Sequence, residues 1–221
     1  MPNFLQARQN MIDSQLKPWG ILNPALLNII FHLPREKFVP TDYQALAYSD
    51  SSLPLLHDQK MLPPKTLARA IQALTIQSAD TVLEIGTGSG YSTLILSRLC
   101  KHLTSIEVIP DILELAKKNL GAFSPHNVDL ILGNGALGYL DSPTKTFNKI
   151  FVAGSYSTAI PKSLIDQLNP EGKLFAFIGE APIQEAVLIS KLSDGTLSQQ
   201  FLFETAVMPL IDAPKQSRFK F

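Results

Sequence analysis

The chain has 221 residues, of which 45% are hydrophobic, and its 19 basic and 19 acidic residues give a formal net charge of zero. This length suits one large α/β domain with a small appendage, and the balanced charge argues against a protein that binds nucleic acid or an anionic membrane surface. The single cysteine, Cys100, excludes an intramolecular disulfide and favours a reducing compartment, and we expect its thiol to be buried and inert.

The first part of the chain predicts helices followed by a linker. Apolar residues recur at helical spacing before and after the sequence KPWG, residues 17–20, which predicts two amphipathic helices within residues 1–33. The proline-rich residues 33–56 then predict a linker that runs over the surface. No segment has the apolar run of a secretory signal or the roughly 20 apolar residues of a membrane span. We therefore expect a cytoplasmic protein without membrane contact.

A helix at about residues 65–76 leads into an alternation of strands and helices. The expected strands are TVLEI, LTSIEV, VDLIL, KIFVAG and KLFAFIG, and the expected helices are YSTLILSRLC, DILELAKKNL and IPKSLIDQL. Strands separated by short helices predict a doubly wound, mostly parallel sheet of the Rossmann-like α/β class. Two further strand-like runs on either side of Asp194 and Gly195 predict a C-terminal hairpin.

The sequence VLEIGTGSGYS, residues 82–92, predicts a cofactor-binding loop between a strand and a helix. Glycines permit a tight turn here and a close approach of the backbone to a ligand. A dinucleotide fingerprint requires a glycine at the position of Tyr91. Glu84, followed by Gly86, Gly88 and Gly90, gives instead a spacing that resembles the S-adenosylmethionine loop of Rossmann-like methyltransferases.

Two positions at the ends of the following strands extend this candidate site. Glu107 ends the next strand, where a carboxylate accepts hydrogen bonds from the hydroxyls of a ribose. NAD has the same ribose, so only the glycine spacing favours S-adenosylmethionine. Asn134 follows the third strand beside Gly135, and its amide suits an adenine ring, with a plain turn as the alternative. We assign cofactor binding to these residues and to the whole glycine loop, including Thr87.

Several segments together resemble one methyltransferase family. They are MIDSQL at residues 11–16, LPREKFVP at 33–40, AYSDSSLPL at 47–55, VLEIGTGSGYSTLIL at 82–96 and IPKSLIDQLNPEGKL at 160–174. In this register the chain resembles the protein-L-isoaspartate O-methyltransferases from residue 1 to about residue 180. The resemblance implies transfer of a methyl group from S-adenosylmethionine to the carboxylate of an isoaspartyl residue in a damaged protein or peptide, which starts its repair. It also implies a sheet whose last strands are ordered differently from those of most methyltransferases.

The chain departs from the family pattern mainly on the side of the methyl acceptor. Asn134 stands where the family usually has Asp, and Asn148 replaces the Asp of an FD pair. The family's Thr-x-Ser-x-Pro motif, whose hydroxyls border the reacting carboxylate, aligns with residues 60–64, so Lys60 and Leu62 replace both hydroxyls while Pro64 is kept. We assign residues 1–64 to a helical extension with the acceptor-side loop, and residues 65–221 to the methyltransferase domain.

These replacements leave the acceptor open. A carboxylate is already ionised near pH 7, so methyl transfer to it needs no general base. The sequence therefore identifies no catalytic residue, and the acceptor-loop candidates are His57, Lys60 and Leu62. An ammonium at Lys60 stabilises the ground state more than the transition state, in which the carboxylate and sulfonium charges cancel. His57 with Asp58 suits a base for a neutral acceptor, with a solvated turn as the alternative. A non-catalytic cofactor-binding paralogue and a methyltransferase with a small-molecule acceptor stay open as alternatives.

Two further expectations concern metals and the C-terminus. The histidines are scattered without metal-ligand spacing, so we expect no metal site. The sequence RFKF, residues 218–221, with FETAVMPL before it, predicts an edge strand and a tail, the alternative being an aromatic tail that closes the substrate cleft. The sequence indicates no oligomeric state.

Overall fold

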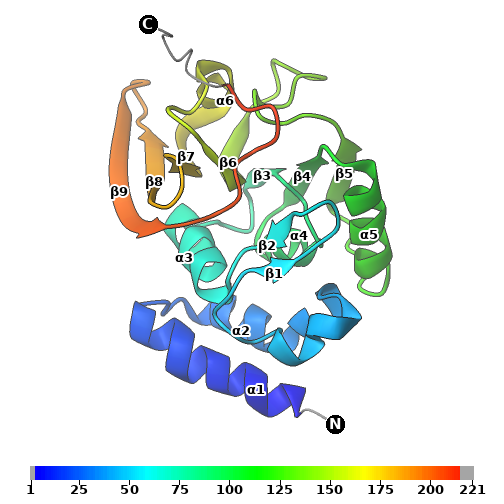
Figure 1. Ribbon diagram of the computed structural model, residues 1–221. Coiled ribbons are helices and arrows are strands. Elements are labelled where there is room, and N and C mark those ends of the chain that lie inside the picture. The colour runs from blue at the N-terminus through cyan, green and yellow to red at the C-terminus, as the bar shows by residue number, and fades with distance from the viewer. Residues whose placement is uncertain (1–2, 215–221) are drawn as a thin grey trace, which may run out of the picture.

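A seven-stranded sheet forms the centre of the molecule in the computed structural model, which describes residues 3–214 (Figure 1). The strands are β3 (Thr81–Ile85), β4 (His102–Glu107), β5 (Val128–Leu132), β6 (Phe147–Tyr156), β7 (Leu168–Ile178), β8 (Gln184–Lys191) and β9 (Leu197–Thr205). Their order is β5-β4-β3-β6-β7-β8-β9; the first five strands are parallel, and the pairings of β7 with β8 and of β8 with β9 are antiparallel. The chain extends the sheet from β3 to β5 in one direction and from β6 to β9 in the other. This arrangement confirms the doubly wound fold and the C-terminal hairpin.

Helices connect the parallel strands because each crossover must return the chain to the same end of the sheet. They are α3 (Pro64–Leu74), which precedes β3, then α4 (Tyr91–Leu99), α5 (Pro110–Gly121) and the short α6 (Lys162–Asp166). Helix α3 begins at Pro64, buries Leu67, Ile71 and Leu74, and ends at Thr75, whose φ of 48° lies in the left-handed region. This left-handed residue ends the helix and redirects the chain toward β3.

Adjacent residues of the central strands belong to different cores, because both faces of the sheet are covered. Val82 and Phe151 pack in a core with α3, α4 and the N-terminal helices. Leu83, which follows Val82, and Ile150, which precedes Phe151, pack in a second core with Leu164 of α6. The near-continuous apolar runs of these strands therefore satisfy two cores at once.

The N-terminal residues form a helical extension that packs into the first of these cores. Its elements are α1 (Phe4–Met11), a π-helical turn (Ile12–Leu16), a 3-10 turn (Lys17–Trp19), α2 (Pro24–His32), two more 3-10 turns (Arg35–Phe38 and Thr41–Leu46), β1 (Leu53–Pro54) and β2 (Lys60–Met61). The linker is thus more ordered than its prolines predict. Strands β1 and β2 form an antiparallel pair that is separate from the main sheet.

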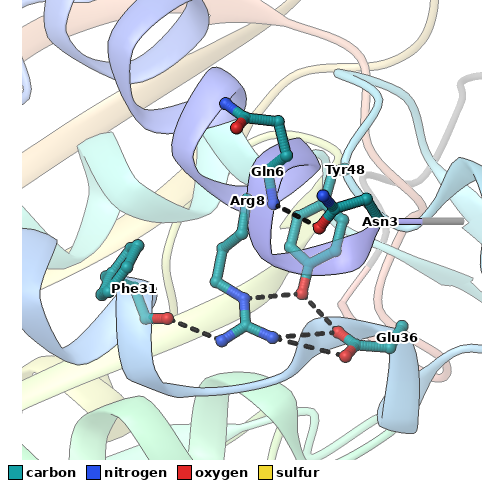
Figure 2. A network of polar contacts seen from close by, with 6 residues as sticks. All are labelled: Asn3, Gln6, Arg8, Phe31, Glu36 and Tyr48. Atoms are coloured by element: carbon teal, nitrogen blue, oxygen red, sulfur yellow. Dashed lines mark hydrogen bonds and ion pairs between the residues drawn. The ribbon is translucent and has the colours of Figure 1, made fainter.

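A nearly buried arginine ties the extension together (Figure 2). Arg8 of α1 donates from Nε to the Tyr48 hydroxyl at 2.9 Å, from Nη1 to the Phe31 carbonyl at 2.6 Å, and from Nη2 to the Glu36 carboxylate at 3.3 Å. The Tyr48 hydroxyl donates to the same carboxylate, and burial raises the pKa of that hydroxyl. One guanidinium therefore joins α1, the end of α2 and the linker.

Some boundaries differ from those the sequence predicts. Helix α6 covers only Lys162–Asp166, and β7 starts at Leu168, because Phe147 pairs with Leu168 and the ladder resumes at Lys173 after a register shift. The NPEG sequence between these pairs resembles a turn in the linear pattern. The RFKF tail lies outside the described residues. No helix of the described chain is long and apolar enough to cross a membrane.

Candidate functional site

The glycine loop joins β3 to α4 in a backbone conformation that favours glycine. Gly86, Gly88 and Gly90 have φ values of 92°, 56° and 86°. A Cβ on Gly90 would lie 3.1 Å from Leu120 of α5, and one on Gly86 would lie 3.2 Å from the Ala153 side chain. The loop therefore needs glycine both for its backbone angles and for its close packing. The backbone N–H groups of α4 begin directly after it, as in loops that hold polar ligands.

Glu84 lies behind this loop and is fully buried. Its Oε2 accepts hydrogen bonds from the Thr93 hydroxyl at 2.6 Å and the Ser105 hydroxyl at 2.7 Å, whereas its Oε1 has no partner. Burial raises the pKa of Glu84 to about 7, against the hydroxyl hydrogen bonds that lower it. Glu84 lines neither of the two cavities that are described below. Its hydrogen bonds instead connect β3 with α4 and β4. Its direct contact with a cofactor stays a prediction.

Glu107 ends β4 with its carboxylate directed at the glycine loop. Its Oε2 accepts from the Gly88 N–H at 2.9 Å, and its Oε1 accepts from the N–H groups of Val108 and Ile109 at 3.0 and 3.1 Å. A carboxylate has about four lone-pair positions, so these bonds leave room for a further donor such as a ribose hydroxyl. Glu107 is thus oriented by the backbone at the position where the sequence predicts the ribose.

A small cavity lies beyond the ends of β3, β4 and β5, and we call it the strand-end cavity. Its volume is about 30 Å³. It is lined by Ile85, Gly86, Ile106, Val108, Gly133, Asn134, Gly135, Ala136, Leu210 and Ile211. Asn134 Oδ1 accepts from the Ala136 N–H at 2.9 Å, so the amide caps its own turn and keeps its NH2 group for a ligand. A Cβ on Gly135 would lie 2.7 Å from Ile85, which shows how closely the backbone passes this strand.

The β1–β2 hairpin covers the glycine loop from the other side. Its turn places His57 and Asp58 at φ values of 54° and 57°, with the Gln59 N–H donating to the Leu56 carbonyl at 3.1 Å, as in a type I′ turn. At the tip, His57 Nε2 lies 2.8 Å from Asp111 Oδ2 of α5. The solvated-turn alternative describes this tip, since the His57 side chain is half exposed and is not among the described residues that line the cavity under the hairpin.

The cavity under the hairpin, which we call the hairpin cavity, brings together the two candidate regions. It has a volume of about 50 Å³. It is lined by Arg35, Lys60, Met61, Leu62, Leu67, Thr87, Ser89, Tyr91, Ser92 and Ala153. Lys60 and Leu62 of the acceptor-side segment therefore face the same space as Thr87 and Tyr91 of the cofactor loop. His57, the third acceptor-side candidate, lies apart from it.

Arg35 is a functional candidate that the sequence reasoning missed. It is only 1% exposed. Its Nε donates to the Ala47 carbonyl and its Nη2 to the Leu62 carbonyl, each at 2.9 Å, and its guanidinium carbon lies 5.0 Å from the centre of the Tyr91 ring. Burial lowers the pKa of Arg35 and raises that of Tyr91 to about 12. A buried cation between both regions cannot be inferred from a charge that is normally exposed.

The remaining titratable groups show no further centre. Cys100 is buried as expected, and burial raises the pKa of its thiol to about 12, which keeps it protonated and inert. No group of three or more His, Cys, Asp or Glu side chains within residues 3–214 is arranged to hold a metal ion.

The fold and the glycine loop together define a class of protein. A doubly wound sheet with an acid-x-Gly-x-Gly-x-Gly loop after the first parallel strand, and an acid at the end of the second, is the arrangement of a Rossmann-like methyltransferase. A family model described as protein-L-isoaspartate(D-aspartate) O-methyltransferase matches residues 6–215. The chain therefore belongs to the protein-L-isoaspartate O-methyltransferase family.

Individual relatives and structures agree with this assignment. The protein-L-isoaspartate O-methyltransferase of Trichlorobacter lovleyi is 36% identical over 211 residues, which cover 96% of each chain. That of Dictyoglomus thermophilum is 37% identical over 194 residues, 87% of this chain and 86% of the relative. A family structure from Plasmodium falciparum, solved with S-adenosyl-L-homocysteine, shares the fold with a TM-score of 0.81 and 20% identity, and the match covers 96% of this chain and 99% of the other.

Proposed function

We propose that this protein transfers a methyl group from S-adenosylmethionine to the carboxylate of isoaspartyl residues in damaged proteins; its curated relatives are named protein-L-isoaspartate O-methyltransferase. The hairpin cavity carries the proposal, because it sets the acceptor-side residues Lys60 and Leu62 against Thr87 of the cofactor loop. A cofactor on that loop and an acceptor under the hairpin would meet there. The family match supports this activity over a non-catalytic cofactor-binding role.

The residues beside the glycine loop fit S-adenosylmethionine. Glu107 keeps acceptor capacity for a ribose hydroxyl, and the Asn134 NH2 group is available to donate to an adenine nitrogen. Ile106, Val108 and the other apolar residues of the strand-end cavity suit the flat faces of the adenine ring. The strand-end cavity and the hairpin cavity lie on either side of the glycine loop, which contributes Gly86 to the first and Thr87 and Ser89 to the second.

The acceptor side of this reaction needs alignment more than acid–base chemistry. A carboxylate oxygen attacks the methyl carbon, the new C–O bond forms, and the C–S bond breaks with its electron pair going to sulfur. No proton moves, because the carboxylate is ionised near pH 7. The protein contributes by holding the oxygen in line and by excluding water. Replacement of two hydroxyls by Lys60 and Leu62 therefore changes positioning and leaves the chemistry feasible.

A methyl-transfer assay tests the proposal directly. The protein is incubated with S-adenosylmethionine labelled in the methyl group and a peptide that contains one isoaspartyl residue, with the normal aspartyl peptide as the matched control. We expect base-labile label on the isoaspartyl peptide alone. Equal labelling of both peptides, or none of either, contradicts the proposal.

The single cysteine suits a reducing cytoplasm, where we propose that the protein acts on polypeptide substrates.

A further inference from the structure

We propose that Arg35 is the anchor for the acceptor carboxylate, assisted by Lys60 from the hairpin; this rests on the proposed function and deepens it. Arg35 is a buried positive charge without an acidic partner among the described residues. No carboxylate of the described residues lies within ion-pair distance of Arg35, although it is only 1% exposed. Buried charges are normally paired, because an unpaired one loses its hydration without compensation. An anionic ligand group would supply the missing partner.

The hydrogen bonds of Arg35 leave one end of its guanidinium free. Nε is used by the Ala47 carbonyl and Nη2 by the Leu62 carbonyl, while no described group accepts from Nη1. Nη1 is also not one of the fully enclosed polar atoms that lack a partner. Arg35 is one of the residues that line the hairpin cavity. A guanidinium edge of this kind is well suited to a carboxylate.

The charges around the cavity favour an anion from the acceptor. Its lining residues include Arg35 and Lys60 and no acid. The nearest acidic groups of the linker are engaged elsewhere, since Asp50 pairs with Lys65 at 2.7 Å and Glu36 pairs with Arg8. Arg35 also fixes the Leu62 carbonyl, so it is joined directly to the segment that aligns with the family's acceptor motif. The methionyl carboxylate of the cofactor is the competing anion, and the test separates the two.

The test compares binding of two peptides to the protein saturated with S-adenosylhomocysteine, so that no turnover occurs. One peptide carries an isoaspartyl carboxylate, and the other carries the neutral amide at the same position. We expect the wild-type protein to prefer the carboxylate by roughly 10- to 100-fold, the range of a buried charge-assisted hydrogen bond. Arg35→Gln should reduce this preference to less than about threefold, and the exposed Lys60→Met should reduce it by up to about fivefold. Lys117→Met, which removes an exposed lysine of α5 that pairs with Glu114, is the matched control and should leave it unchanged.

Each outcome decides the proposal. Equal binding of both peptides by the wild-type protein overturns it, and so does full preference in a folded Arg35→Gln variant. Weaker S-adenosylhomocysteine binding by that variant, with unchanged peptide preference, assigns the charge to the cofactor and also overturns it. If Arg35→Gln does not fold, Arg35→Met, which also removes the charge and places no new polar group in the core, takes its place with the same outcomes. Carboxylate preference without methyl transfer would refute the proposed function alone, whereas methyl transfer without preference would refute Arg35 alone.

Discussion

The clearest energetic consequence of the site concerns Glu84, an acidic side chain that is buried in the core. Its pKa is raised from 4.5 to about 7 because burial penalises the ionised form. The difference is about 2.5 pH units, and at about 1.36 kcal/mol per unit it corresponds to about 3 kcal/mol. A group whose pKa is higher in the folded state binds more protons there, so its contribution to stability is greatest below pH 4.5 and is lost as the pH rises to about 7.

Replacement of Glu84 by Gln isolates this contribution. The amide resembles the protonated carboxyl, keeps an oxygen for the hydroxyls of Thr93 and Ser105, and does not titrate. Stability is measured by urea unfolding between pH 5 and pH 8 for both proteins, and the difference between them removes the other titrating groups. We expect Glu84→Gln to be close to the wild type at pH 5 and more stable by about 3 kcal/mol at pH 8.

The matched control is Glu114→Gln, which changes an exposed acid on α5 that pairs with Lys117. Its unfolding free energy should follow that of the wild type across the pH range, since an exposed pair contributes little. A difference between Glu84→Gln and the wild type that stays constant with pH would refute the reasoning. Such a result would mean that Glu84 ionises in the folded protein as it does in the unfolded chain.

Three further predictions concern the ligand sites. The double replacement Lys60→Thr and Leu62→Ser is measured by steady-state kinetics on an isoaspartyl peptide. It should raise kcat by roughly tenfold and also raise KM, because hydroxyls position the acceptor without stabilising the charged ground state. A lower kcat would contradict this prediction. His57→Asn keeps a residue that tolerates the left-handed turn but loses the hydrogen bond to Asp111, so stopped-flow should show S-adenosylhomocysteine release faster by up to about fivefold; an unchanged release rate would contradict this. Asn134→Asp keeps the bond from the Ala136 N–H but loses the NH2 donor, so by calorimetry it should bind the cofactor about fivefold more weakly; equal or tighter binding would show that Asn134 does not donate to the adenine ring.

The sheet was predictable because each central strand is a run of apolar residues that serves two cores. The pattern cannot show the β1–β2 hairpin, since strands of two residues have no measurable period and its turn uses His57 and Asp58 where glycine or asparagine is the usual signal. The start of β7 was missed for a similar reason. Its NPEG sequence has the composition of a turn, and only pairing with β6 extends the strand through it.

The candidate site also has some parts that the sequence predicts and others that it does not. The shape of the glycine loop and the place of Glu107 beside it were predictable because their spacing reflects backbone geometry that only certain residues allow, whereas their contact with a cofactor stays a prediction. Arg8 and Arg35 were missed because a sequence shows a charge without showing that it is buried, and because their partners, which include the carbonyls of Phe31, Ala47 and Leu62, come from other segments. The available signal was their neighbourhood, since Arg35 lies between prolines and apolar residues in the segment LPREKFVP.

These contacts explain how acceptor choice can change while the cofactor loop stays the same. Arg35, Lys60 and Leu62 all belong to the first 64 residues, whereas the glycine loop and Glu107 belong to the sheet. The two parts meet where Arg35 packs on Tyr91 and where Leu55 lies 3.6 Å from the position of a Cβ on Gly88. A substitution at residue 60 or 62 therefore alters the space above the loop without disturbing the bonds that shape it. For the same reason a bulkier residue at Gly88 should affect both sites, because it would displace the hairpin as well as the loop.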